Sequence, residues 1–346
     1  MTDPTKDEAP LPLSGVRVLD LTHVISGPFC TMMLAHMGAE VVKVERPGTG
    51  DSLRGIPGYE GREGHPDYFN SVNNSKKSIE LNFKNAAHLA AAHALVEKAH
   101  VVVENFAPGT AHRLRMGWAD LQEINSALVH CSISGFGATG PYAKRAAIDP
   151  IIQAVTGLMS VTGDADGPPM LVGTPIGDTA AGMYAAFAIV SALRAAEKTG
   201  AGTHLDISMQ GAMLYAMGCR MAETLQAGIT THRNGSENPF RVPSNVYLTK
   251  DGRYTMIHCS NDRRWQALCR AMEAPDWAEN PGFATMALRQ ENRDEINRRV
   301  AARFAERTLD AWLPRFEAEE TTCIPINDYR EALDNPQVKH RGQVVE

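Results

Sequence analysis

The sequence predicts an α/β protein in which an open parallel sheet is followed by a smaller α+β domain. Three observations predict this fold class. Short β-forming runs alternate with helical segments over residues 15–134, which is the order that βαβ units require. A long apolar helix is expected over residues 178–198, with Gly200 and Gly202 just after its end. Beyond it, two short strands flank Asp251-Gly252, a hairpin turn signature.

The first βαβ unit is expected between residues 15 and 45. Residues 15–22 are rich in β-formers and alternate in part between apolar and polar side chains, which predicts a strand. Pro28 suits the first turn of the helix that follows, and Gly38 suits its end. Residues 41–45 predict the next strand. The alternation continues with a helix over 86–98, a strand over 101–103, a short helix that includes 121–124, and a strand over 128–134.

The second half of the chain predicts the rest of a large domain and then a separate small domain. The helix over residues 178–198 is apolar on all sides in its middle, which is typical of a helix buried inside a protein. A strand over 204–209 and a helix over 210–225 follow it. We therefore expect a large domain over residues 1–225 and a small α+β domain over 226–325. The small domain is expected to contain a loop over 228–243, strands over 246–248 and 254–257, and helices over 262–272, 292–305 and 309–316.

Composition and charge narrow the classes of function. The net charge of −6 is spread over 346 residues without a basic block, so nucleic acid is not an expected partner. The sequence contains no uninterrupted run of eighteen apolar residues, so we expect no membrane span and no membrane partner. The N-terminal sequence MTDPTKDEAPLPL lacks a secretory signal, and the six cysteines include no CxxC pair. These features predict a soluble enzyme in the cytoplasm.

One carboxylate stands out because of its place in the predicted helix. Asp178 lies at the start of the long apolar helix, where the free backbone N–H groups and the positive end of the helix dipole favour an ionised acid. An ionised, partly buried carboxylate can act as a nucleophile. The alternative is that Asp178 caps the helix, which is the commoner role of an aspartate at such a position. The local sequence leaves both interpretations open.

Other motifs are weaker. Residues 135–140 spell GxGxxG, but Pro141 follows at once and the first βα turn has no glycine pair for a dinucleotide, so a tight turn is the better interpretation. No metal site is expected, since His88 and His93 are five residues apart and no HExxH motif is present. His23 follows a predicted strand and is either a base or an ordinary packed histidine.

Basic residues collect near the carboxyl ends of the predicted strands. Parallel sheets bind ligands at that edge, so these side chains could meet an anionic ligand such as a phosphorylated nucleotide. Each of them, taken alone, is equally consistent with a solvated surface charge. The residues are Arg46, Arg54, Lys84 and Arg113.

Several longer stretches together resemble the class III CoA-transferases, the CaiB/BaiF family, from about Leu11 to the end of the chain. Their motifs are closest to the branch that contains formyl-CoA transferase. The number, order and spacing of the stretches carry the resemblance. They are LSGVRVLDLTHVISGP, MGAEVVKVERPGTGDSLR, NNSKKSIELNFK, VVVENFAPG, SISGFGATGP, GDTAAGMYAAFAIVSALRAAEKTGAG and HLDISM.

This resemblance implies a Rossmann-like large domain, a small α+β domain and two interlocked subunits in a homodimer. It implies that Asp178 is the nucleophile, that coenzyme A or acyl-CoA is bound as a substrate, and that no cofactor is held permanently. The acceptor is then a small carboxylic acid. The positions implied to bind coenzyme A are Ile25, Ser26, Arg46, Leu81, Asn82, Phe83, Lys84, Asn105, Phe106, Ala107, Arg113, Ala146, Ala147, Ile148 and Asp149.

The sequence departs from the family pattern in three places. The formyl-CoA branch carries a glutamine where this chain has Ile25, and the glycine run of its small domain is missing, so formyl-CoA:oxalate exchange is not the expected reaction. Family members also extend some tens of residues further and return to the large domain. Residues 326–346 are therefore expected to be a shortened return. Short dicarboxylic acids with succinyl-CoA as the donor fit the habits of the family.

Two alternatives stay open at this stage. A racemase of the same fold needs a histidine immediately before an aspartate to move a proton, and this chain has Ile148 before Asp149. A non-catalytic CoA-binding subunit would not need a nucleophile at Asp178. As a transferase, the protein would stabilise oxyanions with backbone N–H groups, for which the turns at Gly137 and Gly140 are the expected donors.

Overall fold

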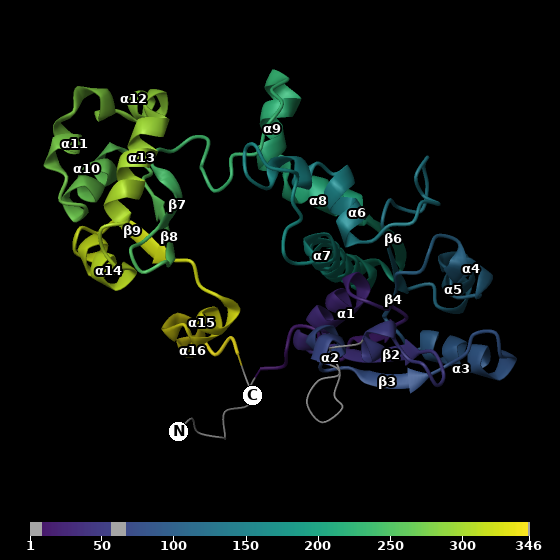
Figure 1. The fold of residues 1–346 in the computed structure, drawn as a ribbon. Helices are drawn as coiled ribbons and strands as arrows, with labels where there is room; N and C mark the ends of the chain where they lie inside the picture. The colour runs from purple at the N-terminus through teal and green to yellow at the C-terminus, as the bar shows by residue number, and fades with distance from the viewer. Residues whose placement is uncertain (1–8, 57–66, 345–346) are drawn as a thin grey trace, which may run out of the picture. The chain divides into compact units, whose positions relative to one another are not determined.

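The computed structural model describes residues 9–56 and 67–344. The chain forms two compact units, each with its own hydrophobic core (Figure 1). The first unit contains Met1–Val161 and Pro169–Thr231, and the second contains Thr162–Pro168 and His232–Glu346.

An open parallel sheet forms the centre of the first unit, as the sequence predicts, and its six strands include β3, which was not expected. Its strand order is β3-β2-β1-β4-β5-β6, and every neighbouring pair is parallel. From β1 the chain adds strands toward one edge of the sheet as far as β3, and from β4 it adds them toward the other edge. Open α/β sheets bind ligands in the crevice outside the carboxyl ends of the two strands at which this order changes, here β1 and β4. The strands are β1 (Arg17–Asp20), β2 (Glu40–Glu45), β3 (Lys77–Glu80), β4 (Val101–Glu104), β5 (Val129–Ser134) and β6 (Thr203–Ser208).

Helices cover both faces of this sheet. On one face α1 (Ser26–His36) and α7 (Ile176–Thr199) pack against each other and share a core with Val18, Val101 and Cys131. The opposite face carries a second core, to which α3 and α5 contribute. The other helices of this unit are α2 (Asp67–Asn73), α3 (Ala86–Val96), α4 (Thr110–Arg113), α5 (Trp118–Ile124), α6 (Asp149–Val155), α8 (Met209–Ala216) and α9 (Gly218–Ala227), with short 3-10 turns at η1 (Ser52–Gly55) and η3 (Leu158–Val161).

The helix α7 is the central helix of the first unit. By length and composition alone it could cross a membrane, which corrects the expectation that no segment of this kind is present. Half of its most apolar stretch is buried by protein, and it packs against α1, α8, β5 and β6. Its burial follows from its small and apolar side chains, which include Ala180, Ala181 and Ala185.

The second unit combines a small antiparallel sheet with a cluster of helices. Its strand order is β7-β8-β9, and the expected hairpin is present as β7 and β8. The core contains Trp265, Trp312 and Phe304. The elements are β7 (Ser244–Leu248), β8 (Tyr254–His258), α10 (Asp262–Ala271), α11 (Pro275–Glu279), η4 (Pro281–Phe283), α12 (Met286–Glu291), α13 (Arg293–Phe304), α14 (Leu309–Ala318), β9 (Thr322–Pro325), α15 (Tyr329–Asp334) and α16 (Pro336–His340).

The structure differs from the expected elements in several details. The helix expected over residues 210–225 is two helices, α8 and α9, which separate at Met217. The expected domain boundary at 225/226 lies inside α9, and residues 326–344 group with the second unit rather than with the large domain. The division into two compact units does not test the expected domain limits. A large domain over 1–225, a small domain over 226–325 and a return over 326–346 therefore remain a prediction.

Candidate active site

Asp178 lies in the first turn of α7, but it does not cap that helix. The helix begins at Ile176, and Pro175 before it provides no side-chain cap. The carboxylate of Asp149 takes this role, because its Oδ1 accepts hydrogen bonds from Gly177 N (2.6 Å) and Asp178 N (3.3 Å). The capping interpretation of Asp178 is therefore wrong. Its side chain is free to face other groups.

Ser26 is the residue that faces the Asp178 carboxyl. It is the first residue of α1 and is 5% exposed, and both its hydroxyl and its backbone N–H donate to Asp178. Gly182, one turn further along α7, permits this approach. A Cβ atom at Gly182 would lie 2.7 Å from Ser26 O and 3.0 Å from Phe29 Cδ1, so the glycine lets α1 and α7 come together.

The surroundings of Asp178 make it a weaker acid. Burial, and after it the negative charge of Asp149, raise the pKa of Asp178 to about 6, although the two hydrogen bonds from Ser26 act in the opposite direction. This corrects the expectation that free N–H groups at the helix end favour the ionised form of Asp178. Asp149 accepts from two of those N–H groups. At pH 7 and above Asp178 is still mainly ionised, as a nucleophile must be.

A cavity of about 860 Å³ opens at the carboxyl ends of the strands of the first unit. Volumes of this size are typical of sites for cofactors and other organic ligands. Among the described residues, Arg46 and Lys84 have no acidic partner, so their charges are available to an anionic ligand. The residues of this cavity that the resemblance implies as CoA-binding are Arg46, Leu81, Asn82, Phe83, Lys84 and Phe106.

Other expected CoA-binding positions lie outside the lining of this cavity. Arg113 Nη2 donates to Oγ1 of Thr110, which does line it (2.7 Å). Ile25 packs beside Leu53 and Phe69. Ala107 is exposed. Arg54 was among the basic residues expected to be available to an anionic ligand. Its guanidinium group instead pairs with Glu45 (2.7 Å) and lies over the ring of Phe69.

The segment 146–149 does not reach the cavity either. Ala146 and Ile148 are exposed, and Ala147 packs closely against Gly135. Asp149 is buried, and its carboxylate points to the start of α7. Of these four positions only Asp149 is shown beside Asp178, and none of the four lines the cavity at the strand ends.

One loop joins the cavity to Asp178. His23 lines the cavity and stacks on Phe106, with 5.9 Å between the ring centroids. Asn105 holds the backbone of His23 on both sides, because Oδ1 accepts from His23 N (2.9 Å) and Nδ2 donates to His23 O (2.8 Å). The same Nδ2 lies 3.4 Å from Ser26 Oγ. The predicted residues Asn105, Phe106 and Ser26 thus belong to a continuous path between the cavity and the acid.

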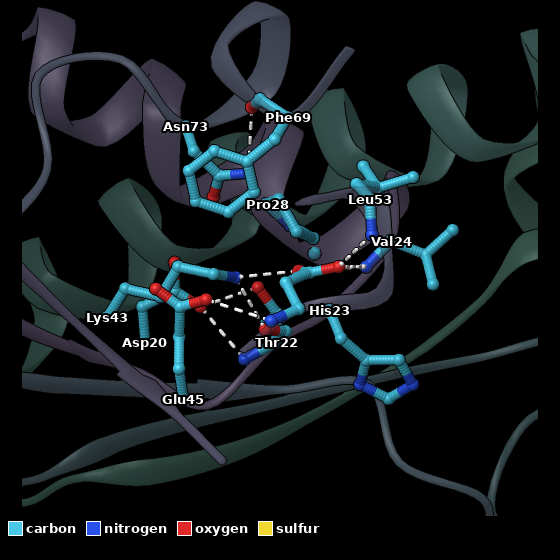
Figure 2. Close-up of polar contacts among 12 residues, drawn as sticks. Asp20, Thr22, His23, Val24, Pro28, Lys43, Glu45, Leu53, Phe69 and Asn73 are labelled. Carbon is cyan, nitrogen blue, oxygen red and sulfur yellow. Dashed lines mark hydrogen bonds and ion pairs between the residues drawn. The ribbon is translucent and has the colours of Figure 1, made fainter. Parts of the chain in front are cut away.

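Buried charged side chains hold the loop that contains His23 and Val24 (Figure 2). The side chains of Lys43 and Asp51 are each 1% exposed and form an ion pair of 3.1 Å. Lys43 Nζ also donates to Thr22 O (2.7 Å), and Asp51 Oδ2 accepts from Val24 N (3.2 Å). Val24 has a φ of 64°, an unusual conformation for a β-branched residue, and the surrounding contacts hold it there. The loop is therefore held in one position.

The glycine-rich segment 135–140 is a tight turn. Gly137 and Gly140 have φ values of 91° and 94°. The N–H of Gly137 donates to Ser134 Oγ, and that of Ala138 donates to Asp206. The N–H groups of Gly137 and Ala138 are therefore already used within the fold, which removes the expected oxyanion donor at Gly137. Among residues 9–56 and 67–344, no group of three or more His, Cys, Asp or Glu side chains is placed to hold a metal ion.

Sequence reasoning missed several residues on which this site depends. Gly182, Lys43 and Asp51 were not singled out. A lysine in the middle of the buried strand β2 is a signal that could have revealed Lys43, because such a charge requires a buried partner. Gly182 in an otherwise apolar helix is a signal of close helix packing.

Comparisons with known proteins agree with the expected family. Residues 13–346 match the model of CoA-transferase family III. Human succinyl-CoA:glutarate CoA-transferase is 37% identical over 97% of this chain and 76% of that protein. Acetyl-CoA:oxalate CoA-transferase of Acetobacter aceti is 36% identical over 100% of this chain and 88% of that protein.

Solved structures show the same likeness over both units. A CaiB/BaiF family protein from Brucella suis superposes with a TM-score of 0.90 at 32% identity, over 97% of this chain and 89% of that one. Rv3272 of Mycobacterium tuberculosis gives a TM-score of 0.86 at 27% identity, over 98% and 90% of the two chains. The sequence match and the shared fold lead to one conclusion: the chain belongs to CoA-transferase family III.

Proposed function

We propose that Asp178 is the nucleophile with which this family III CoA-transferase moves coenzyme A from an acyl-CoA to a carboxylic acid. The observation that carries the proposal is the placement of Asp178. It lies at the start of a buried helix, faces two donors from Ser26, and is joined through Asn105 and His23 to a cavity of about 860 Å³.

The reaction proceeds by exchange at three carbonyl carbons, those of the donor, of Asp178 and of the acceptor. A carboxylate oxygen of Asp178 attacks the thioester carbon of the donor, the C–S bond breaks, and a mixed anhydride and CoA thiolate form. The thiolate attacks the enzyme carbonyl, which releases the donor acid and leaves an aspartyl-CoA thioester. The acceptor carboxylate then attacks this thioester and displaces the thiolate. The thiolate finally attacks the acceptor carbonyl of the new anhydride, giving the new acyl-CoA and free Asp178.

A carboxylate nucleophile suits this exchange because the anhydride and the thioester keep the free energy of the substrate thioester. Each addition produces an oxyanion that needs hydrogen-bond donors. The hydroxyl and the backbone N–H of Ser26, which donate to the free Asp178 carboxylate, are the proposed donors to these oxyanions. Once Asp178 is acylated, they can donate to the oxygen that develops charge.

Coenzyme A is assigned to the cavity at the strand ends. Arg46 and Lys84 line it and supply positive charge for phosphate groups, and Phe106 and His23 present flat rings. Two further expected positions hold residues of these walls, since Asn105 binds the backbone of His23 and Arg113 donates to Thr110. Coenzyme A enters here as a substrate.

Succinyl-CoA and short dicarboxylic acids are the proposed substrates. Relatives of this chain are named succinyl-CoA:glutarate, succinyl-CoA:mesaconate and succinyl-CoA–D-citramalate CoA-transferase, at 37%, 38% and 34% identity. The apolar Ile25 next to Ser26 is consistent with a longer acid than formate. A racemase is not supported, because the exposed Ile148 side chain before Asp149 cannot carry a proton.

The proposal includes a homodimer that works in the cytoplasm. The resemblance implied both. Large apolar side chains on α7 and α8 support an interface with a second copy, since Phe187 is 73% exposed and Tyr215 is 76% exposed.

The test is transfer from succinyl-CoA to glutarate by the variant Asp178→Asn. The variant is expected to lose at least about a thousandfold in kcat, because a nucleophile is removed, and to bind coenzyme A as the unaltered protein does. Asp310→Asn removes an exposed acid from the first turn of α14 and is the matched control. Turnover by Asp178→Asn at the unaltered rate would refute the nucleophile, and an unaltered protein that binds coenzyme A without any transfer would indicate a non-catalytic subunit.

A further inference from the structure

Two carboxylates meet at the start of α7, and the proposed mechanism uses only one of them. Asp149 is the first residue of α6 and is 8% exposed. Its Oδ1 accepts from Gly177 N (2.6 Å) and Asp178 N (3.3 Å), and its Oδ2 accepts from Gln153 Nε2 (2.6 Å). Within residues 9–56 and 67–344, no lysine, arginine or histidine pairs with Asp149. A buried carboxylate is thus held by neutral donors alone.

The neighbouring residues are shaped around Asp149. A Cβ atom at Gly177 would lie 2.9 Å from Asp149 Oδ1, so the glycine makes room for the carboxylate. Gln153, one turn further along α6, is 1% exposed, and its Oε1 accepts from Val172 N (3.0 Å). Gln153 therefore ties Asp149 to the segment that leads into α7. This construction requires an acid or another small acceptor at position 149.

A negative charge held here acts on Asp178. Burial is the largest cause of the raised pKa of Asp178, and Asp149 is the charged group that adds to it. The elements that pack against α7 bring no lysine or arginine, since α1, α6, α8, β5 and β6 contain none. Their titratable side chains are Cys30, His36, His130, Cys131, Asp149, His204, Asp206 and Tyr215.

The same charge bears on covalent chemistry at Asp178. Formation of the mixed anhydride with the acyl group, or of the thioester with CoA, converts the Asp178 carboxylate into a neutral group, as protonation does. A fixed negative charge nearby therefore favours the anhydride and the thioester over the free carboxylate, and it also makes the carboxylate a stronger base and nucleophile. The opposite arrangement, a cation beside Asp178, would hold the enzyme in its unreacted form.

We infer that Asp149 is a positioning residue for Asp178, which fixes the first turn of α7 and whose charge favours the neutral, covalently modified forms of the nucleophile. The inference rests on the proposed function, since it assumes that Asp178 is acylated. It assigns to Asp149 a role in the reaction in place of contact with coenzyme A.

Asp149→Asn separates the charge from the geometry. The asparagine oxygen can still accept from Gly177 N, while the negative charge is gone. The control is Asp328→Asn, the same change at an exposed carboxylate that caps α15 and accepts from Glu331 N (2.8 Å). Each protein is mixed with succinyl-CoA between about pH 5 and pH 8.5, and the covalent adduct at Asp178 is followed by mass spectrometry of the quenched protein.

The unaltered protein and Asp328→Asn are expected to form the adduct with a rate that rises through about pH 6 and then levels off. In Asp149→Asn the midpoint should fall by about one pH unit, as loss of a nearby like charge predicts. The covalent fraction at about pH 7.5 should fall about tenfold, because each pH unit of midpoint corresponds to a tenfold change in the equilibrium.

A purely structural Asp149 would lower the amount of adduct at every pH and leave the midpoint unchanged, and that result overturns the inference. If Asp149→Asn fails to fold, Asp149→Ser also offers an oxygen to Gly177 N without the charge, and the same downward shift is expected. Absence of any adduct at Asp178 in the unaltered protein is a different result. It refutes the proposed function itself.

Discussion

Asp178 is subject to opposing influences whose balance sets its reactivity. Burial and the charge of Asp149 favour its neutral form, while the two donors of Ser26 favour the carboxylate. The result is a pKa of about 6 instead of 3.8, so the acid is ionised in neutral solution but close to the point at which it takes up a proton. For the proposed nucleophile this means that the ionised carboxylate is reactive, and that its burial beside Asp149 lowers the free energy of unfolding.

That cost predicts how stability depends on pH. Because the pKa of Asp178 is higher in the folded chain, protonation stabilises the fold fully below about pH 4, and this stabilisation is lost as the pH rises through about 6. Asp178→Asn stays neutral at every pH. Its free energy of unfolding at pH 7.5 should exceed that of the unaltered protein by roughly 2 kcal/mol, with little difference at pH 4.

Urea unfolding at the two pH values measures this difference. Asp310→Asn, the exposed acid in the first turn of α14, serves as the control and should change stability little at either pH. A variant Asp178→Asn that is less stable than the unaltered protein at pH 7.5 would contradict the account of a destabilised carboxylate.

The sequence identified Asp178 but not its surroundings. An acid at the start of an apolar helix can be recognised from a local pattern, and the family resemblance assigned its role. The residue that accepts from its N–H is Asp149, 29 positions earlier, and no local pattern relates the two. The expectation that the helix end favours the ionised form of Asp178 was wrong for this reason.

At the scale of elements, the site depends on how closely α1 approaches α7. Gly182 is the point of contact, because its missing Cβ leaves room for Ser26 O and Phe29. The first turn of α1 is in turn fixed by the loop before it, whose backbone is held by Asn105, Lys43 and Asp51. The two helices and this loop together bring the donors of Ser26 to Asp178.

Gly182→Ala tests that contact. The new methyl group would overlap Ser26 O and Phe29, so α1 must move away from α7. We expect a loss of stability of about 1–3 kcal/mol, as overpacking produces, together with a fall in kcat. The control is Gly218→Ala in α9, where a Cβ atom would meet no neighbour within 4 Å. Equal activity and stability of the two variants would show that the close approach is unimportant.

The elements that the sequence predicted are those with strong patterns. Strands β1, β2, β4 and β5 are largely buried and each contains β-branched residues, and α7 is long and apolar, so all were expected. The strand β3 was not expected, because Lys77–Glu80 is short and mostly polar. The divided helix α8–α9 was missed since apolar residues continue across the break at Met217.

At the scale of the whole molecule, the topology decides where the cavity proposed for coenzyme A forms. The sheet order changes direction between β1 and β4, and the cavity lies at the carboxyl ends of these strands and of β2 and β3. Arg46 follows β2 and Lys84 follows β3, so their charges meet although 38 residues separate them in sequence. The sequence predicted a gathering of basic residues at this edge, although Arg54 pairs with Glu45 instead and Arg113 lies outside the lining.

Arg46→Ala and Lys84→Ala test the assignment of coenzyme A to this cavity. Loss of one charge-assisted contact to phosphate should raise the KM for succinyl-CoA about tenfold or more, with a smaller effect on kcat. Lys98→Ala alters an exposed lysine that is not part of the cavity and should leave KM unchanged. An unchanged KM in both cavity variants would place coenzyme A elsewhere.

The most direct test of the central claim is to identify the residue that becomes covalently modified. The protein is incubated with succinyl-CoA, trapped with hydroxylamine, digested and mapped by mass spectrometry. We predict a hydroxamate on Asp178 that is absent from Asp178→Asn. Modification of a different carboxylate, or CoA transfer that proceeds with Asp178 unmodified, would contradict the account.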